Sequence, residues 1–325
     1  MTVAVAGIGT TGANVIRHLI ELGVDRLRLH DINPDAERQV AGLVARGAEF
    51  APPLGGEPPA AVILATPCGK QALMARELLE AGSHVVSISD SPEDVVELLR
   101  LDPVARDRGV SMVVGAGMAP GLGCLLARHA GDQLDQVDAV SIAKAGTAGP
   151  ACARQHHLAL KRPGRDWVGD GWEFRAGGSG RDLAWFPDPI GARDCYRGAL
   201  PSPILLHRQY PNAKRLSARV SATRRDRLTA RLPMMREPHD DGGPGAVRAE
   251  VRGWRDGSVE TIIYAVAAFP SSVAAAVAAV VALRAVDGKA PAGATGLCEW
   301  PDVGEVLRAV HGRGVPISVF EGVGA

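Results

Sequence analysis

Cysteine is scarce in this chain of 325 residues, and its cysteines are not arranged in pairs. The five are Cys68, Cys124, Cys152, Cys195 and Cys298, and no two of them form a Cys-x-x-Cys motif. An odd, scattered set provides no disulfide framework and lacks the close ligand spacing of a structural zinc site. The sequence therefore predicts neither disulfides nor a metal centre.

An excess of charge of either sign is also absent, because Lys plus Arg and Asp plus Glu number 36 each. A dedicated nucleic-acid-binding protein gains most of its affinity by neutralising phosphates, so this balance argues against a nucleic-acid partner. Three arginines do cluster, at Arg224, Arg225 and Arg227. We interpret them as a solvated face or an anion contact.

The chain shows neither a basic-then-apolar signal sequence at its start nor a long unbroken apolar run. The longest uncharged stretch, residues 261–283, is interrupted by Pro270-Ser271-Ser272, which favours a strand, a break and a buried helix over a membrane span. With 46% apolar residues, the chain can form real hydrophobic cores. The expectation is a cytoplasmic protein without a membrane partner.

The sequence does contain a regular alternation of short apolar runs and amphipathic stretches up to about residue 130. Buried strands alternating with helices predict a Rossmann α/β fold with a doubly wound parallel sheet. After residue 130 alternating strands dominate, and Asp256-Gly257 is a hairpin-turn signal between two of them. We therefore predict an NAD-binding domain over residues 1–130 and an α+β domain with a mixed or antiparallel sheet over 131–286. The segment from about 287 to 325 is expected to return to the first domain.

The strongest motif is Gly7-Ile8-Gly9-Thr10-Thr11-Gly12, which directly follows the first strand and opens the first helix. In this setting the first glycine permits a tight turn, the second lets the backbone approach a pyrophosphate, and the third lets helix and strand pack closely. The helix N-terminus offers unpaired N–H groups and a partial positive charge. This turn, including Thr10 and Thr11, is therefore predicted to bind a dinucleotide.

Asp31 ends the second predicted strand and is the expected partner of this turn. A carboxylate there accepts hydrogen bonds from the adenosine ribose and would repel the 2′-phosphate of NADP. The next residue is Ile32, not an arginine that would favour NADP. The sequence therefore favours NAD, with NADP as the less favoured alternative.

Further contacts are expected where other strands end, because ligands of doubly wound sheets bind beyond the carboxyl ends of the strands. Thr66, Pro67 and Ser87 are candidate cofactor contacts, and Asp90 is a candidate substrate contact. Alternatively, Asp90 and its neighbours only cap the N-terminus of the following helix. A second glycine run, residues 115–123, is interpreted as a tight crossover near the nicotinamide.

Together these motifs resemble the saccharopine dehydrogenase-like family. The similarity rests on the N-terminal glycine turn, the acid after the second strand, residues 87–90, the Pro120-Gly121 pair, and the glycine-containing segments near the end of the chain. The resemblance implies a nicotinamide-linked oxidoreductase acting on amino acids or on imines formed from an amine and a carbonyl. It also implies a second domain that supplies the substrate cleft and the contact of a homodimer.

Candidate chemistry in the second domain rests on residue type. Lys144 is a candidate proton donor or carboxylate ligand, and His156 is a candidate proton shuttle because histidine titrates near neutral pH. Tyr196 is the third catalytic candidate. Gln155 and Arg193 are candidate substrate contacts, since the arginine fork matches a carboxylate. An ordinary structural role stays open for each of them.

Three functions fit the sequence. The first is an NAD-dependent oxidoreductase with an amino acid or imine as its small-molecule substrate. The second is a reductase of the same fold acting on a carbonyl or an activated alkene, for which a more apolar cleft is expected. The third is a non-catalytic dinucleotide-binding protein, which would bind the cofactor without turnover.

Overall fold

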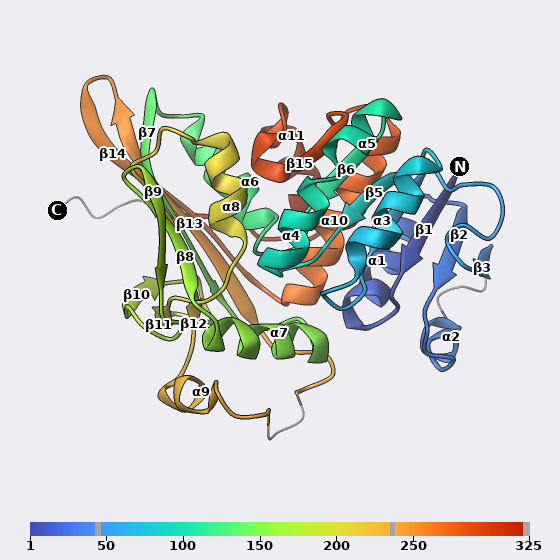
Figure 1. The fold of residues 1–325 in the computed structure, drawn as a ribbon, viewed down its shortest axis with the longest axis horizontal. Helices are drawn as coiled ribbons and strands as arrows, with labels where there is room; N and C mark the ends of the chain where they lie inside the picture. Colours follow the sequence, from blue (N-terminus) through green and yellow to red (C-terminus); the bar gives the residue numbers. More distant parts are fainter. Residues whose placement is uncertain (43–46, 235–237, 321–325) are drawn as a thin grey trace.

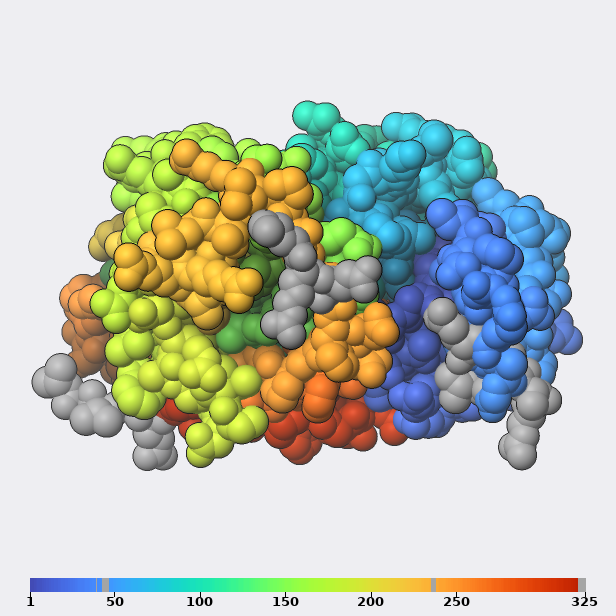
Figure 2. Space-filling view, turned by 90° about the horizontal axis from the view of Figure 1, so that it is seen from below, coloured from blue at the N-terminus to red at the C-terminus, as the bar shows by residue number. Residues whose placement is uncertain are grey.

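The computed structural model describes residues 1–42, 47–234 and 238–320. These residues form two sheets, and each sheet is the centre of one half of the molecule (Figure 1). The half coloured blue and teal and the half coloured mainly green to orange lie side by side, as the space-filling view also shows (Figure 2).

The first sheet is parallel and has seven strands in the order β15-β6-β5-β4-β1-β2-β3. Its inner strands are short and fully or almost fully buried, as expected for strands covered on both faces. The order is that of a doubly wound dinucleotide-binding sheet, so the predicted Rossmann fold is confirmed. The strands are β1 (Thr2–Ala6), β2 (Arg26–His30), β3 (Ala48–Phe50), β4 (Ala61–Leu64), β5 (His84–Ser87), β6 (Ser111–Val114) and β15 (Gly293–Gly296).

Helices cover both faces of this sheet. Helix α1 buries Gly12, Val15, Ile16 and Leu19, which share one side because they are three or four residues apart. It packs against α10 on one face, whereas α3, α4 and α5 pack together on the other. These helices are α1 (Thr10–Glu21), α2 (Ala36–Val40), α3 (Gln71–Glu80), α4 (Pro92–Leu99), α5 (Asp102–Asp107) and α10 (Pro270–Val286).

The second sheet has nine strands, with the main order β10-β11-β12-β7-β13-β14-β16 and the β8–β9 hairpin beside β12. Strands β7 and β12 are parallel and the other pairs antiparallel, so the predicted mixed sheet is confirmed. The strands are β7 (Gln136–Ala145), β8 (Gly164–Val168), β9 (Gly171–Arg175), β10 (Asp182–Trp185), β11 (Ala192–Tyr196), β12 (Arg215–Ser221), β13 (Gly245–Arg255), β14 (Ser258–Ala268) and β16 (Ser318–Phe320).

The remaining helices fill the space around this second sheet and between the halves. Helices α6 and α8 pack on the sheet, and α7 lies between the two halves near the bottom of Figure 1. No helix in the described part of the chain has the length and hydrophobicity needed to cross a membrane. These helices are α6 (Leu122–Gly131), α7 (Pro150–Lys161), α8 (Ser202–Gln209), α9 (Arg224–Thr229) and α11 (Val303–His311), with a short 3₁₀ turn over Leu297–Glu299.

The two halves of the structure do not divide at residue 286, the predicted end of the second domain. Helix α10, which the sequence assigns to the second domain, packs on α1, β4 and β5 of the first half. Its Ala and Val residues are buried nearly all round, and such a helix needs cover on every side. The C-terminal segment after residue 286 contributes to both halves. Strand β15 extends the first sheet beside β6, and β16 pairs with β14 in the second sheet. Residues 321–325 of the predicted tail lie outside the described residues.

Candidate active site

The glycine turn between β1 and α1 is crowded at two glycines and open at the third. A Cβ on Gly7 would lie 2.6 Å from the backbone of Ala65, and one on Gly12 would lie 1.9 Å from the carbonyl oxygen of Gly7. A Cβ on Gly9 would meet nothing within 4 Å. The protein itself therefore gives no steric reason for glycine at position 9, whereas a diphosphate lying against the backbone would.

Asp31 is held against this turn from the end of β2. Its Oδ2 accepts a hydrogen bond from the N–H of Ile8 at 2.6 Å, and its Oδ1 accepts one from the N–H of Asn33 at 2.8 Å. Each carboxylate oxygen has a second acceptor site, so both remain able to bind a ribose hydroxyl. Asp31 also lines a pocket of about 250 Å³ between β2 and the start of α2, with 95% of Ile32 exposed next to it.

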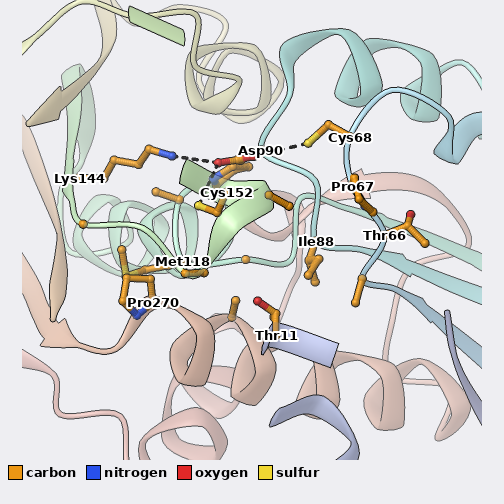
Figure 3. A pocket seen from close by; sticks show the side chains of 18 residues that line it. Thr11, Thr66, Pro67, Cys68, Ile88, Asp90, Met118, Lys144, Cys152 and Pro270 are labelled. Atoms are coloured by element: carbon orange, nitrogen blue, oxygen red, sulfur yellow. Dashed lines mark hydrogen bonds and ion pairs between the residues drawn. The ribbon is translucent and has the colours of Figure 1, made fainter. Parts of the chain in front are cut away.

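A second cavity, of about 110 Å³, opens between the two halves beside the glycine turn. Figure 3 shows side chains from both halves lining it, with Thr11 and Thr66 on the cofactor side and Lys144 opposite. Most of its wall is apolar, from residues such as Ile88, Met118 and Pro270. In doubly wound sheets, ligands bind in the crevice beyond the carboxyl ends of the strands, which is where this cavity lies.

Asp90 and Lys144 provide the charges of this cavity. Asp90 follows β5, Lys144 lies on β7, and their Oδ2 and Nζ atoms are 3.1 Å apart. The side chains are 16% and 6% exposed, respectively. Burial disfavours the charged form of the lysine, but the adjacent Asp90 carboxylate more than offsets it, so the pKa of Lys144 is raised. Lys144 is therefore an ammonium ion at neutral pH.

Two thiols flank the same carboxylate. The Sγ atom of Cys68 lies 3.6 Å from Oδ1 of Asp90, and the Sγ atom of Cys152 lies 3.9 Å from Oδ2. Burial and the negative charge of Asp90 raise the pKa of Cys68 to about 12 and that of Cys152 to about 11. Both side chains are therefore neutral thiols at physiological pH, not nucleophilic thiolates.

Five of the predicted site residues line this cavity, whereas the hydroxyl groups of Thr10 and Ser87 form hydrogen bonds elsewhere in the protein. Thr11, Thr66, Pro67, Asp90 and Lys144 all line it. The hydroxyl of Thr10 instead donates a hydrogen bond to the carbonyl oxygen of Asp240, at 2.6 Å.

Ser87 is fully buried, and its hydroxyl donates to the side chain of Gln71 at 2.6 Å. The hydroxyl therefore forms its hydrogen bond inside the protein and is not exposed to the cavity. This geometry does not favour the predicted direct contact of Ser87 with the cofactor.

His156 lies on α7, one turn after Cys152, and is not among the residues that line the cavity. Burial, followed by the positive charge of Lys144, lowers the pKa of His156 to about 4. Its Nδ1 atom has no hydrogen-bond partner among the described residues. The imidazole is therefore neutral near pH 7, and it lies outside the lining of the cavity where its predicted shuttle role would operate.

The other candidates from the second domain lie away from the cavity wall. Tyr196 is buried in a separate apolar cluster, where the guanidinium of Arg227 lies 4.1 Å from its ring centroid. Arg193 lies on β11 and points to solvent, and Gln155 is buried on α7 without lining the cavity. Tyr196, Arg193 and Gln155, predicted as a catalytic residue and two substrate contacts, therefore lie outside the lining of this cavity.

The cavity wall also contains residues that were not predicted from the sequence. Cys68 directly follows the predicted contacts at residues 66–67, so its place at a strand end was a usable signal. Pro270 reaches the cavity from α10, and no local pattern indicates that contact. The second glycine run does form a tight crossover along the wall, since a Cβ on Gly121 would lie 2.1 Å from the carbonyl oxygen of Gly117.

Comparison with solved structures places this arrangement among known folds. Saccharopine dehydrogenase (L-Glu forming) from Saccharomyces cerevisiae superposes with a TM-score of 0.73, at 15% identity, over 98% of this chain and 100% of the other. The chain has a saccharopine dehydrogenase-like fold. The resemblance predicted from the sequence is thereby confirmed at the level of the fold.

Two other structures share this saccharopine dehydrogenase-like fold more distantly. GenD2 from gentamicin A biosynthesis, in complex with NAD, has a TM-score of 0.50 at 15% identity, over 99% of this chain and 97% of its own. Amine dehydrogenase from Mycobacterium smegmatis has a TM-score of 0.55 at 11% identity, over 93% and 96%. No family model and no curated protein sequence matches the chain.

Proposed function

We propose that this protein is an NAD-dependent oxidoreductase that transfers a hydride to or from an amine- or imine-type substrate. The observation that carries the proposal is the Asp90–Lys144 pair, which faces a cavity whose opposite wall is the dinucleotide turn at Thr11. Two solved proteins of the same fold are named as dehydrogenases of saccharopine and of amines, which supports this substrate class.

The residues around the turn suit NAD. Gly9 leaves room for a diphosphate against the backbone, and Asp31 offers acceptor sites to the ribose. Among the described residues that line the pocket beside Asp31, the two charged carboxyl side chains are Asp31 and Glu37. Arg38, the first arginine that follows Asp31 in the sequence, is paired with Asp35. Two acidic groups at this pocket disfavour the 2′-phosphate of NADP and support a preference for NAD.

The protein's own contribution to the chemistry is the movement of a proton. When bound, NAD supplies the hydride-accepting or hydride-donating nicotinamide. The ammonium of Lys144 has three N–H donors, and Asp90 accepts from it, so other donors are available to a substrate nitrogen or oxygen. During reduction, Lys144 provides the proton that this atom takes up. Oxidation is the reverse of this step, so it starts from the form in which Lys144 is a neutral amine, and that amine takes up the proton that the atom releases.

The apolar wall of the cavity is consistent with an alternative function, the reduction of a carbonyl compound. An α-amino acid substrate needs a partner for its carboxylate, and the arginine expected in that role, Arg193, lies elsewhere. Lys144 is already neutralised by Asp90. These features also suit a reductase of the same fold that acts on an uncharged carbonyl compound, for which the same proton donor would serve.

A spectrophotometric screen tests the proposal. Purified protein is offered amines, amine plus keto-acid pairs and neutral ketones, with NADH and NADPH in parallel, while nicotinamide absorbance is followed. We expect NADH-dependent turnover with an amine plus carbonyl pair. Turnover confined to neutral ketones would select the alternative. Dinucleotide binding without any turnover would indicate a non-catalytic protein, and calorimetry without a binding signal for either dinucleotide would exclude all three.

Association into a homodimer remains a prediction. Apolar side chains are exposed on two strands of the second half, with Phe174 of β9 at 59%, and Leu183 and Trp185 of β10 at 53% and 61% of full exposure. Exposed apolar groups of this size are typical of a contact surface. Analytical ultracentrifugation of the wild type and of a Trp185→Lys variant tests whether they hold two chains together.

A further inference from the structure

The outer face of the second sheet carries a trough of about 490 Å³ that is separate from the candidate active site. The trough runs across the three central strands β12, β7 and β13, and its wall is completed by residues of β10 and β11. The alternate residues of β7 that face the trough, Ala139, Ser141 and Ala143, have small side chains. The cavity is of the size that small-molecule ligands occupy.

Arginines flank this floor in register. Arg215 on β12 and Arg252 on β13 both pair with Ala139, one on each side of it. Because adjacent strands lie about 4.8 Å apart, these two long side chains rise from either side of a narrow floor.

A second pair repeats the arrangement four residues further along β7. Arg219 and Arg248 lie on either side of Ala143. Between the two arginine pairs lie Ser217, Ser141 and Glu250, side by side on the three strands, with the two hydroxyls 3.2 Å apart. The floor is therefore bordered by guanidinium groups at both ends.

Only part of this positive charge is neutralised within the protein. Arg219 forms a bidentate pair with Asp166, at 2.8 and 2.9 Å, and Arg248 lies 2.6 Å from Glu250. Arg215 and Arg252 have no carboxylate partner among the described residues. The trough thus combines the buried Arg219 and the partly buried Arg248, each in an ion pair, with the exposed Arg215 and Arg252.

We propose that this trough binds a small, multiply charged anion bearing several phosphate or carboxylate groups. Arginine forks match both kinds of oxygen pair, and several forks around one cavity select a ligand with several negative charges. Among the described residues that line the trough, six are arginines and two, Asp182 and Glu250, are acids. A second copy placed on the trough would bring the same excess of positive charge against it, which disfavours that contact and favours an anion as the occupant.

A ligand in the trough would lie back to back with the candidate active site. Ala143 faces the trough, and the next residue, Lys144, faces the cavity on the opposite side of the same strand. Binding at the trough can nevertheless be measured without turnover, so the outcome does not depend on the proposed oxidoreductase function.

The test is isothermal calorimetry with inorganic pyrophosphate, tripolyphosphate and citrate at constant ionic strength, on the full chain. We expect saturable binding that is at least tenfold weaker in Arg215→Gln/Arg252→Gln. The matched control, Arg100→Gln/Arg108→Gln, removes the same charge from exposed positions without ion pairs in the described structure, and we expect it to bind as the wild type does. The phosphate and citrate arms distinguish the two ligand classes.

Three results would overturn the proposal. The first is the absence of saturable binding for all three anions. The second is equal binding by both double variants, which would place the anion at the dinucleotide turn or elsewhere. The third is a wild-type dimer, seen by sedimentation, that Arg215→Gln/Arg252→Gln dissociates, because a second copy would then occupy the trough. Circular dichroism of each variant verifies that it is folded.

Discussion

Asp90, which follows strand β5 of the first sheet, and Lys144, on strand β7 of the second, form an ion pair of 3.1 Å across the gap between the halves. The two residues are 54 positions apart in the sequence. Both side chains are largely removed from water, and each compensates the charge of the other. This pair links the packing of the two halves to the proposed proton transfer.

Removing one partner of this pair is expected to affect both stability and activity. In Asp90→Asn the buried ammonium loses its counter-charge, which should lower the free energy of unfolding by about 3 kcal/mol. Turnover should fall at least about a hundredfold, because the proton donor and acceptor no longer act together. Urea unfolding and steady-state kinetics measure the two effects separately.

The double variant Asp90→Asn/Lys144→Met distinguishes a structural from a functional role. It should regain most of the stability, since no charge is left unpaired, but not the activity. The matched control is Glu93→Gln at the exposed Arg162–Glu93 pair, which spans 3.0 Å, and a loss of less than about 1 kcal/mol is expected there. Full turnover in the double variant would contradict the proposed proton transfer.

The glycine turn allows folding and cofactor binding to be tested separately. Gly9→Ala adds a Cβ where nothing lies within 4 Å, so stability should be unchanged while the dissociation constant for NAD rises at least about tenfold. Gly12→Ala places a Cβ 1.9 Å from a backbone oxygen, so it should lower the melting temperature. Thermal unfolding and calorimetric titration with NAD measure these effects. Gly304→Ala, also without neighbours within 4 Å, is the control.

Asp31→Ala tests the predicted ribose contact. Loss of charge-assisted hydrogen bonds of about 1.5–3 kcal/mol should weaken NAD binding by roughly 10- to 100-fold. The preference for NADH over NADPH should also decrease, because the carboxylate that repels a 2′-phosphate is gone. Asp35→Ala, which removes an acid paired with Arg38 nearby, is the control. An unchanged dissociation constant for NAD in Asp31→Ala, measured by fluorescence titration, would exclude the contact.

His156 should make the stability of the protein depend on pH between about 4 and 6.5. Burial and the charge of Lys144 lower the pKa of His156 to about 4, from an ordinary value of 6.5 in the unfolded chain. The unfolded state binds more protons in this window, so stability is fully present above it and is lost as the pH falls through it. The loss should amount to about 2–3 kcal/mol.

The variant His156→Gln isolates this contribution. Its free energy of unfolding, measured in urea at pH 4.5 and 7.5, should differ less between the two pH values than that of the wild type. His157→Gln changes the next histidine, whose Nε2 lies 2.8 Å from the carbonyl oxygen of Leu232, and serves as the control. An identical pH dependence in the wild type and His156→Gln would show that the imidazole does not titrate in this way.

The sequence by itself determined the turns and contacts that form between residues close together along the chain. The crowded positions of Gly7 and Gly12 and the approach of Asp31 follow from a strand, a turn and a helix in sequence. Asp256 and Gly257 join β13 and β14, with φ angles of 49° and 77°, because an Asp-Gly pair readily adopts left-handed backbone conformations. The parallel and mixed sheets follow from the hydrophobic patterns of their strands.

Only the tertiary structure decided which distant side chains meet. Lys144 reaches Asp90, whereas Tyr196 is buried beside Arg227 and Arg193 is exposed on β11. Helix α10 joins the first half although its chain neighbours belong to the second sheet. Hydrophobic patterns fix which side of a strand or helix is buried, but they do not specify which partner buries it. That choice depends on how whole sheets and helices pack, and the candidate active site lies where two such assemblies meet.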